Sequence, residues 1–272
     1  MLLNLPIHSR RVSLALAPAT LALVLASGLM PSPAAAQVVD EPAEATTPAE
    51  PQSQALTTTP PARASMSDPV TVSYNLGMAT DYSTRGVSQT GGKPVLQGGL
   101  EVAGGYFYAG TWASNVDFGD GTEAEIDVYA GVRGESRGID WDLRALGYAY
   151  VGQPDGSEYN YVEFRASAAK QFGPATLGAV VFYAPDYFGT TSDESLFLQA
   201  TGAYEINPRL SLSAGLGRQW IPGPGDHTTW HFGPTYKATE RVSVDLRYYD
   251  TDRHELGSNY DSRVVLGVKT LF

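Results

Sequence analysis

The fold of this chain is decided by Val264-Val265-Leu266-Gly267-Val268-Lys269-Thr270-Leu271-Phe272. Val264, Leu266 and Val268 fall on one face of an extended strand, while Gly267 and Lys269 fall on the other. A strand with lipid on one face and a polar lumen on the other needs this period of two. A strand of a soluble sandwich can show the same alternation, so the prediction depends on how often the pattern recurs.

The pattern recurs through most of the chain in segments of about nine to twelve residues, close to the ~9–11 residues that a tilted strand needs to cross a bilayer. The predicted strands are 70–80, 94–102, 106–116, 122–133, 139–150, 159–169, 175–183, 195–204, 210–220, 228–236, 242–249 and 262–272. The sequence therefore predicts an all-β fold, a transmembrane antiparallel β-barrel of about twelve strands.

The predicted connections alternate in length. The short ones are 103–105, 134–138, 171–174, 206–209 and 237–241, and the longer ones are 81–93, 152–158, 184–194, 221–227 and 250–261. Only 117–121 is short among the second set. Outer-membrane barrels have short periplasmic turns and longer outer loops, whereas a sandwich has no reason to sort its loops in this way.

Aromatic residues gather near the predicted strand ends, as in the two interfacial girdles of a membrane barrel. The outer girdle is expected to include Tyr82, Tyr150 and Phe182, and the inner one Phe107 and Phe172.

The first part of the chain is expected to lie outside the barrel. Residues 1–36 carry Arg10-Arg11, an apolar run and Ala34-Ala35-Ala36, which is typical of a cleaved signal peptide. Residues 37–68 are rich in Pro, Thr, Ala and Glu and predict a disordered periplasmic linker, and residues 69–272 form the barrel. The chain has no cysteine, which excludes disulfides and a cysteine-linked lipid anchor.

The charge pattern separates the predicted lumen from the predicted outer loops. The lumen is expected to hold acids and bases in balance: Glu101, Glu125, Asp127, Asp140, Asp142, Glu163 and Asp245 with Arg133, Arg144, Arg165, Arg241, Arg247, Arg263 and Lys269. The outer loops and their flanks are acidic, with Asp81, Asp117, Asp120, Glu123, Asp155, Glu158, Asp186, Asp193, Glu194, Asp226, Asp250, Asp252, Glu255 and Asp261 against Arg85, Lys93 and Arg253. An acidic mouth concentrates cations and disfavours nucleic acid as a partner, although solvated loops have the same composition.

Three predicted strands carry an acid-x-Arg unit that faces inward. The units are Asp142-Leu-Arg144, Glu163-Phe-Arg165 and Asp245-Leu-Arg247. Residues two apart share a face, so each acid can neutralise its own arginine. Such pairs either line a water-filled path for polar solutes or interlock and close the lumen. Small residues at Gly77, Gly99, Gly131 and Gly267 favour the open path.

The sequence also contains residues that could form a hydrolase site or a calcium site. His254 and Ser258 share a predicted outer loop and are the residues that an outer-membrane hydrolase would use, but a Gly-containing loop holds a nucleophile poorly. Asp117, Asp120 and Glu123 could form a calcium site, but they lack the twelve-residue calcium-loop spacing. We therefore expect no catalytic residue, metal or cofactor.

The segment after the first strand carries a family resemblance. Asp81-Tyr82-Ser83-Thr84-Arg85-Gly86-Val87-Ser88-Gln89, with Tyr108-Ala109-Gly110-Thr111-Trp112 and Glu125-Ile126-Asp127 further on, resembles the TorF family, proteobacterial proteins classed as porins by their barrel character. The resemblance runs from about residue 70 to 272 and implies a barrel in the Gram-negative outer membrane.

These observations predict a narrow passive porin for small polar or ionic solutes, or else a closed barrel with a structural or surface-interaction role. Asp81 and Arg85 are the predicted constriction, in which Arg85 pairs with Asp81 and Gly86 permits the turn. The expected partners are outer-membrane lipid and lipopolysaccharide, small polar solutes, and the barrel assembly machinery through Phe272.

Overall fold

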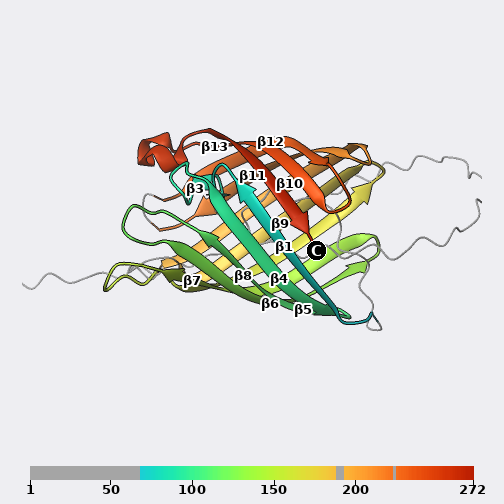
Figure 1. Cartoon of the computed structure of the whole chain (residues 1–272), viewed down its shortest axis with the longest axis horizontal. Coiled ribbons are helices and arrows are strands. Elements are labelled where there is room, and N and C mark those ends of the chain that lie inside the picture. Colours follow the sequence, from blue (N-terminus) through green and yellow to red (C-terminus); the bar gives the residue numbers. More distant parts are fainter. Residues whose placement is uncertain (1–67, 188–192, 223–224) are drawn as a thin grey trace, which may run out of the picture. The chain divides into compact units, whose positions relative to one another are not determined.

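The computed structural model describes residues 68–187, 193–222 and 225–272 as a closed antiparallel barrel of twelve strands (Figure 1). The wall strands are β1 (Thr71–Ala79), β4 (Val95–Gly104), β5 (Phe107–Asn115), β6 (Ala124–Ser136), β7 (Ile139–Val151), β8 (Tyr161–Phe172), β9 (Ala175–Tyr187), β10 (Asp193–Asn207), β11 (Leu210–Trp220), β12 (His227–Lys237), β13 (Val242–Thr251) and β14 (Arg263–Leu271). Each strand pairs with its neighbours in the chain, and β1 also pairs with β14.

Every predicted strand is present, which confirms the fold class. The main difference lies at 184–194, where the sequence predicted a loop. In the structure β9 continues to Tyr187 and β10 starts at Asp193, and these two residues pair with each other. The register shifts between Asp193 and Ser195, so the ladder continues past an irregularity. A bulge interrupts the strict alternation of side chains without ending the strand. A strand predicted from period two therefore ends too early at this position.

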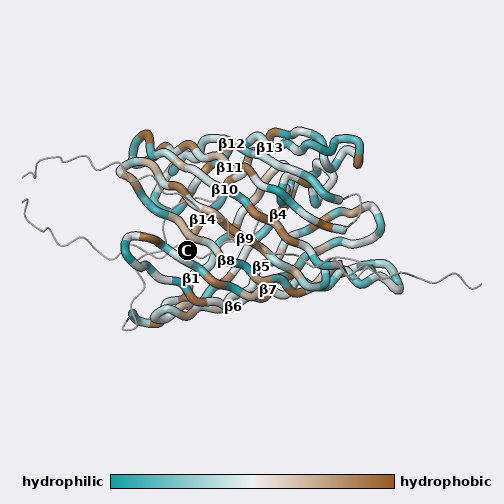
Figure 2. Tube along the Cα trace, turned by 180° about the vertical axis from the view of Figure 1, so that it is seen from behind, coloured by the Kyte–Doolittle hydropathy of each residue, from teal (hydrophilic) through white to brown (hydrophobic). Residues whose placement is uncertain are grey.

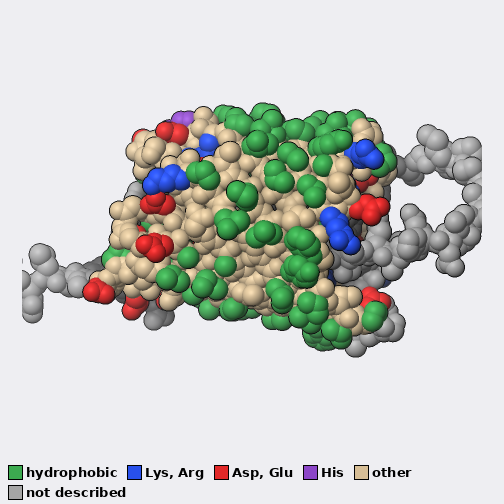
Figure 3. Space-filling model, viewed as in Figure 1, with side chains coloured by type: hydrophobic (Ala, Val, Ile, Leu, Met, Phe, Trp, Pro, Cys, Tyr) green, Lys and Arg blue, Asp and Glu red, His purple; other side chains and the backbone are tan. Residues whose placement is uncertain are grey.

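The strands alternate between an apolar outer face and a polar inner face. In β1, Val72, Tyr74, Leu76 and Met78 are all exposed, whereas Gly77 between them is buried. The alternation is visible along the tube in Figure 2. In Figure 3 hydrophobic side chains cover the middle of the visible face, while charged ones gather near its two ends. This is the surface that a barrel presents to hydrocarbon between two polar layers.

The connections sort by length as predicted. Residues 80–94, 116–123, 152–160, 221–226 and 252–262 connect strands at one end, which we call the loop end, and 105–106, 137–138, 173–174, 208–209 and 238–241 connect them at the other, the turn end. The segment 252–262 contains two short 3-10 helices, η1 (His254–Leu256) and η2 (Ser258–Tyr260). The described residues include no helix long and apolar enough to cross a membrane.

The segment 80–94, named L1 below, contains a small hairpin of its own. Its strands are β2 (Ser83–Thr84) and β3 (Val87–Ser88), and they form a sheet separate from the barrel wall. The turn between them needs two residues with positive φ, Arg85 at 52° and Gly86 at 83°. Mirror-image two-residue turns of this kind match the twist of a hairpin, and glycine adopts them without strain.

The barrel closes where β1 meets β14. Phe272 donates its amide to the carbonyl of Tyr74 at 2.9 Å, and the two rings stack with centroids 5.0 Å apart. The predicted signal peptide, residues 1–36, and the predicted linker, residues 37–68, lie outside the described residues except for Asp68.

Candidate functional site

The inner face of the barrel carries the predicted charged residues. Glu125, Asp127, Arg133, Asp142, Arg144, Glu163 and Arg247 are buried, and Arg165, Asp245 and Lys269 are partly buried on the same inward faces. Arg241 is the exception, because it lies in the turn 238–241 and is exposed. Its predicted place in the lumen is wrong, since β13 starts at Val242, as predicted, and Arg241 belongs to the turn before it.

One group of charges, which we call the wall cluster, packs against β4 to β8 toward the turn end. It consists of Glu101, Tyr108, Tyr129, Arg133, Asp142, Arg144 and Arg165. The guanidinium of Arg133 lies 4.4 Å from the ring centroid of Tyr108. The hydroxyl of Tyr108 accepts a hydrogen bond from Arg144 and donates one to Asp142. The charged groups of the wall cluster are thus bound by neighbouring charged and tyrosine side chains of the barrel wall.

A second group lies on the facing wall. Arg247 donates to both carboxylate oxygens of Asp245, at 3.1 and 2.6 Å, and to the hydroxyl of Ser213 at 2.9 Å. Thr235 donates to the same carboxylate at 2.7 Å. Because the twelve strands close in order, β13, which carries Asp245 and Arg247, is opposite β7, so the two groups lie on opposite walls.

The acid-x-Arg units pair differently from the prediction. Only Asp245 and Arg247 form a close pair within their own unit. Asp142 receives Arg165 from the neighbouring strand at 2.6 Å, while Arg144 of its own unit is 3.8 Å away. Glu163 pairs with Arg85 of L1. Side chains on adjacent strands compete for each acid, and two-residue spacing cannot tell which neighbour wins.

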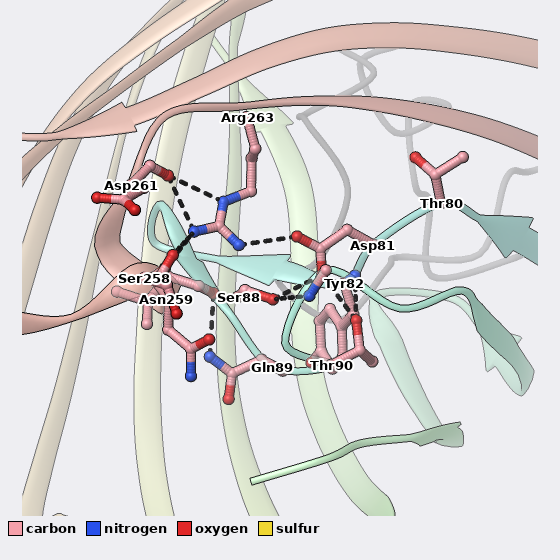
Figure 4. Close-up of polar contacts among 12 residues, drawn as sticks. Thr80, Asp81, Tyr82, Ser88, Gln89, Thr90, Ser258, Asn259, Asp261 and Arg263 are labelled. Carbon is pink, nitrogen blue, oxygen red and sulfur yellow. Dashed lines mark hydrogen bonds and ion pairs between the residues drawn. The ribbon is translucent and has the colours of Figure 1, made fainter. Parts of the chain in front are cut away.

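The base of L1 is fixed by Asp81 (Figure 4). Its carboxylate accepts hydrogen bonds from Ser88 at 2.7 Å, Thr90 at 2.6 Å and Arg263 at 2.8 Å. Arg263 also donates to the carbonyls of Ser258, Asn259 and Asp261 in the loop 252–262. The predicted Asp81–Arg85 pair is therefore wrong, because Asp81 is satisfied locally and the turn carries Arg85 away from it.

The tip of L1 reaches the opposite side of the lumen. Arg85 donates to the side-chain carbonyl of Gln219 on β11 at 2.7 Å and forms an ion pair with Glu163 on β8. Its guanidinium lies over the rings of Phe182 and Phe197, each with its centroid 5.1 Å away. L1 starts between β1 and β4, and β9 is the strand opposite β1 in the barrel order.

Other parts of L1 contact the remaining walls. Tyr82 donates to Glu125 on β6 at 2.8 Å and packs edge-on against Trp112 of β5. A ring nitrogen of His227 on β12 lies 2.9 Å from the carbonyl oxygen of Arg85. A Cβ at Gly86 would overlap the hydroxyl of Thr229, also on β12. L1 thus crosses the lumen at the loop end and contacts β5, β6, β8, β11 and β12.

Asp127 is the least satisfied acid of the lumen. Its side chain is fully buried, and within the described part of the chain neither carboxylate oxygen has a hydrogen-bond partner. Glu125 lies two residues away on the same face of β6. Burial without a partner is costly for an ionised group.

Several contact residues of this site were not predicted. Phe197 and Gln219 lie on predicted strands but have no local motif, and His227 was predicted in the connection 221–227, whereas in the structure it starts β12. Tyr82, Tyr150 and Phe182 were assigned to the outer girdle, but they are buried inside. Exposed aromatics do occur at Phe107, Phe172, Tyr204, Trp220, Tyr236 and Phe272. Nearness to a strand end does not settle which face a ring occupies.

The small inward residues differ in the space around them. A Cβ at Gly131 would lie 2.5 Å from the hydroxyl of Tyr108, and one at Gly99 would lie 3.0 Å from the carbonyl oxygen of Thr111. A Cβ at Gly77 or Gly267 would make only ordinary contacts, with nearest atoms at 3.4 and 3.7 Å. An open path along the lumen therefore stays a prediction.

The acids of the outer loops are used in local contacts. Lys93 pairs with Asp117, and this pair with the amide of Gly119 holds the pKa of the Asp117 carboxyl below its usual value. Asp120 accepts from the amide of Thr122 and the hydroxyl of Tyr159, which lowers the pKa of Asp120. Two of the three carboxylates considered for calcium, Asp117 and Asp120, are thus engaged by groups of the chain itself.

The residues weighed for a hydrolase site are not arranged as one. A ring nitrogen of His254 lies 2.7 Å from Asp250, and this hydrogen bond raises the pKa of His254. Ser258 accepts at its backbone carbonyl from Arg263, and its hydroxyl is not paired with His254 in the described structure. The histidine is bound to an acid rather than poised beside a nucleophile.

The closed antiparallel barrel, apolar outside and charged inside, defines a fold shared with outer-membrane porins. The chain itself belongs to a family described as "Bacterial protein of unknown function (Gcw_chp)", which matches residues 63–270. No curated protein matches it significantly.

Among solved structures the chain is similar to a KdgM porin in complex with disordered oligogalacturonate, with a TM-score of 0.50, 9% identity, and coverage of 75% of this chain and 99% of the porin. It is also similar to the NanC porin, with a TM-score of 0.49, 11% identity and coverage of 74% and 98%. An outer membrane channel from Pseudomonas putida F1 has a TM-score of 0.45 and 13% identity, with coverage of 77% and 97%. At these identities the likeness concerns the fold alone.

Proposed function

We propose that this protein is a porin-like channel of the Gram-negative outer membrane, through which small polar or ionic solutes diffuse passively, with L1 as its constriction. One observation carries the proposal: a loop, L1, crosses the lumen at the loop end and contacts the opposite wall. The tip of L1 is held through Arg85 between Glu163 and Gln219. A loop held by a few side-chain contacts can leave the lumen while the barrel stays intact.

The location follows from the surface of the barrel. Its outward side chains are apolar over the strands, and its charged residues gather toward the ends (Figure 3). We accordingly propose outer-membrane lipid as the partner of the wall. Contact of the acidic loops with lipopolysaccharide through divalent ions, and recognition of Phe272 by the assembly machinery, stay predictions, as does the absence of nucleic acid among its partners.

The finer family assignment also belongs to this proposal. The segment Asp81–Gln89, which carries the resemblance to the TorF family, forms the inserted part of L1. We propose that the shared feature of such proteins is this inserted hairpin. We also propose that the protein is a passive channel and not an enzyme.

A second candidate is a closed barrel with a structural or surface-interaction role. The observation that favours it is the same contact, because L1 touches walls on several sides of the lumen and buries Glu163 and Gln219 fully. If L1 never leaves, we propose the acidic outer loops as the surface through which the described barrel acts.

Single-channel recording separates the two candidates. The full chain, refolded and inserted in a planar bilayer, is compared with Arg85→Ala. A porin with L1 as its constriction gives small cation-selective steps, and Arg85→Ala enlarges them about twofold or more because the tip of L1 loses its anchors. Arg241→Ala removes an exposed arginine at the turn end and is the matched control, expected to behave as the wild type.

Silence of both wild type and Arg85→Ala, with insertion verified by heat-modifiable migration, would contradict the channel and support the closed barrel. Equal conductance of Arg85→Ala and wild type would show that L1 is not the constriction.

A further inference from the structure

Among the described residues, the contacts that hold the side chain of Arg85 at the tip of L1 come from the barrel wall. We call the place that they form the Arg85 pocket, and its members are Glu163, Phe182, Tyr187, Phe197 and Gln219. They come from β8, β9, β10 and β11, and none belongs to L1. The pocket and its occupant are therefore separate parts of the molecule.

The pocket members are themselves fixed by the wall. Tyr148 donates to the second carboxylate oxygen of Glu163 at 3.0 Å. The amide of Gln219 donates to the hydroxyl of Ser195 at 2.5 Å, which leaves its carbonyl oxygen directed at the cation. Glu163 and Gln219 have no exposed surface. The acceptors are positioned by groups other than Arg85, so the geometry does not depend on the occupant.

The chemistry of the pocket selects one kind of ligand. A carboxylate and an amide carbonyl accept from different N–H groups of one planar cation, while the rings of Phe182, Phe197 and Tyr187 offer their negative faces to it. A guanidinium combines planar donors with weak hydration and stacks on aromatic rings, which a compact ammonium or a metal ion does not.

The occupant is bound by a hairpin that docks imperfectly. Arg85 itself has a positive φ of 52°, a conformation that costs energy in a residue other than glycine. The hydroxyl of Ser83 is buried without a hydrogen-bond partner within the described structure. Withdrawal of the tip returns the Ser83 hydroxyl to water, so a free ligand of the same chemistry competes with an occupant whose docking leaves a buried polar group unpaired.

We propose that the Arg85 pocket is the recognition site for a solute carrying a guanidinium group, which takes the place of Arg85 at Glu163 and releases the tip of L1 from the lumen. The inference names the solute class for the proposed channel and rests on that function. The acidic outer loops concentrate such cations at the loop end.

The test measures binding without current. Thermal unfolding of the refolded protein in detergent is followed with methylguanidinium chloride and, at equal ionic strength, with sodium chloride. Arg85→Ala removes the cation that pairs with the buried Glu163, so methylguanidinium is expected to restore part of the lost stability, whereas sodium is not. Arg85→Ala/Glu163→Gln, which lacks the acid, should bind it about tenfold more weakly or worse.

No stabilisation of folded Arg85→Ala beyond that given by sodium would overturn the proposal, as would equal stabilisation of the double variant. If Arg85→Ala does not fold, Gly86→Ala supplies the vacant pocket, because its Cβ overlaps Thr229 and keeps the tip out. The bilayer recordings decide the channel separately, so a silent barrel that binds methylguanidinium would refute the porin function and leave the pocket standing.

Discussion

At the scale of single residues, Asp127 gives the clearest prediction. A fully buried carboxylate without partners is destabilising when ionised, and Asn of nearly the same shape removes the charge. We expect Asp127→Asn to raise the free energy of unfolding by about 1 kcal/mol or more. The matched control is Asp142→Asn, which should lower it, because Asp142 accepts from Tyr108 and Arg165. Urea unfolding of the refolded barrels measures both. A loss of stability in Asp127→Asn comparable with that in Asp142→Asn would show that Asp127 is satisfied.

Which residues face the lumen could be predicted from the sequence, but their partners could not. The period of two placed Glu163 and Arg165 on the inner face correctly, since side-chain direction in a strand is local. The partner of Glu163 is Arg85, which lies 78 residues away in the chain. Such a pair depends on where L1 docks, and no spacing rule contains that information.

At the scale of elements, the L1 hairpin makes a prediction that two glycines of the same loop can test. Gly86 and Gly91 both have positive φ, at 83° and 60°, so Ala costs about 1 kcal/mol of backbone strain at either position. Only at Gly86 does a Cβ also overlap the wall, at Thr229, whereas Gly91 has nothing within 4 Å. We expect Gly86→Ala to enlarge the single-channel conductance and Gly91→Ala to leave it unchanged. Equal effects of the two variants would show that backbone strain, and not contact with the wall, positions the hairpin.

The wall strands were predictable as elements and the docking of L1 was not. Each strand carries its own signal of length and alternation, so errors were confined to ends such as that of β9 at Tyr187. β2 and β3 are two residues long and show no period. The Asp81–Gln89 segment did mark a special loop, and Gly86 did mark its turn. The direction of the tip, however, is set by contacts with β8, β11 and β12 that form only in the folded barrel.

At the scale of the whole molecule, closure depends on the seam between β1 and β14. Phe272 and Tyr74 stack across this seam with an interplanar angle of 11°. Such a contact contributes about 0.5–1.5 kcal/mol beyond the area it buries. We expect Phe272→Ala to lower the temperature at which the folded band is lost on semi-native electrophoresis. Phe107→Ala removes an aromatic of similar exposure from β5, away from the seam, and should have the smaller effect. The reverse order would show that the seam is not the weak point of the barrel.

The position of L1 early in the chain sets an order of events during biogenesis. Its hairpin is made just after the first wall strand, but Glu163, Gln219 and Arg263, which receive it, follow 78, 134 and 182 residues after their partners. L1 is therefore synthesised before most of the wall strands, but it reaches its final contacts only after they have formed. Arg85 can reach its partners only after β8 and β11 have joined the wall. A docked L1 hairpin therefore indicates that the barrel has already closed.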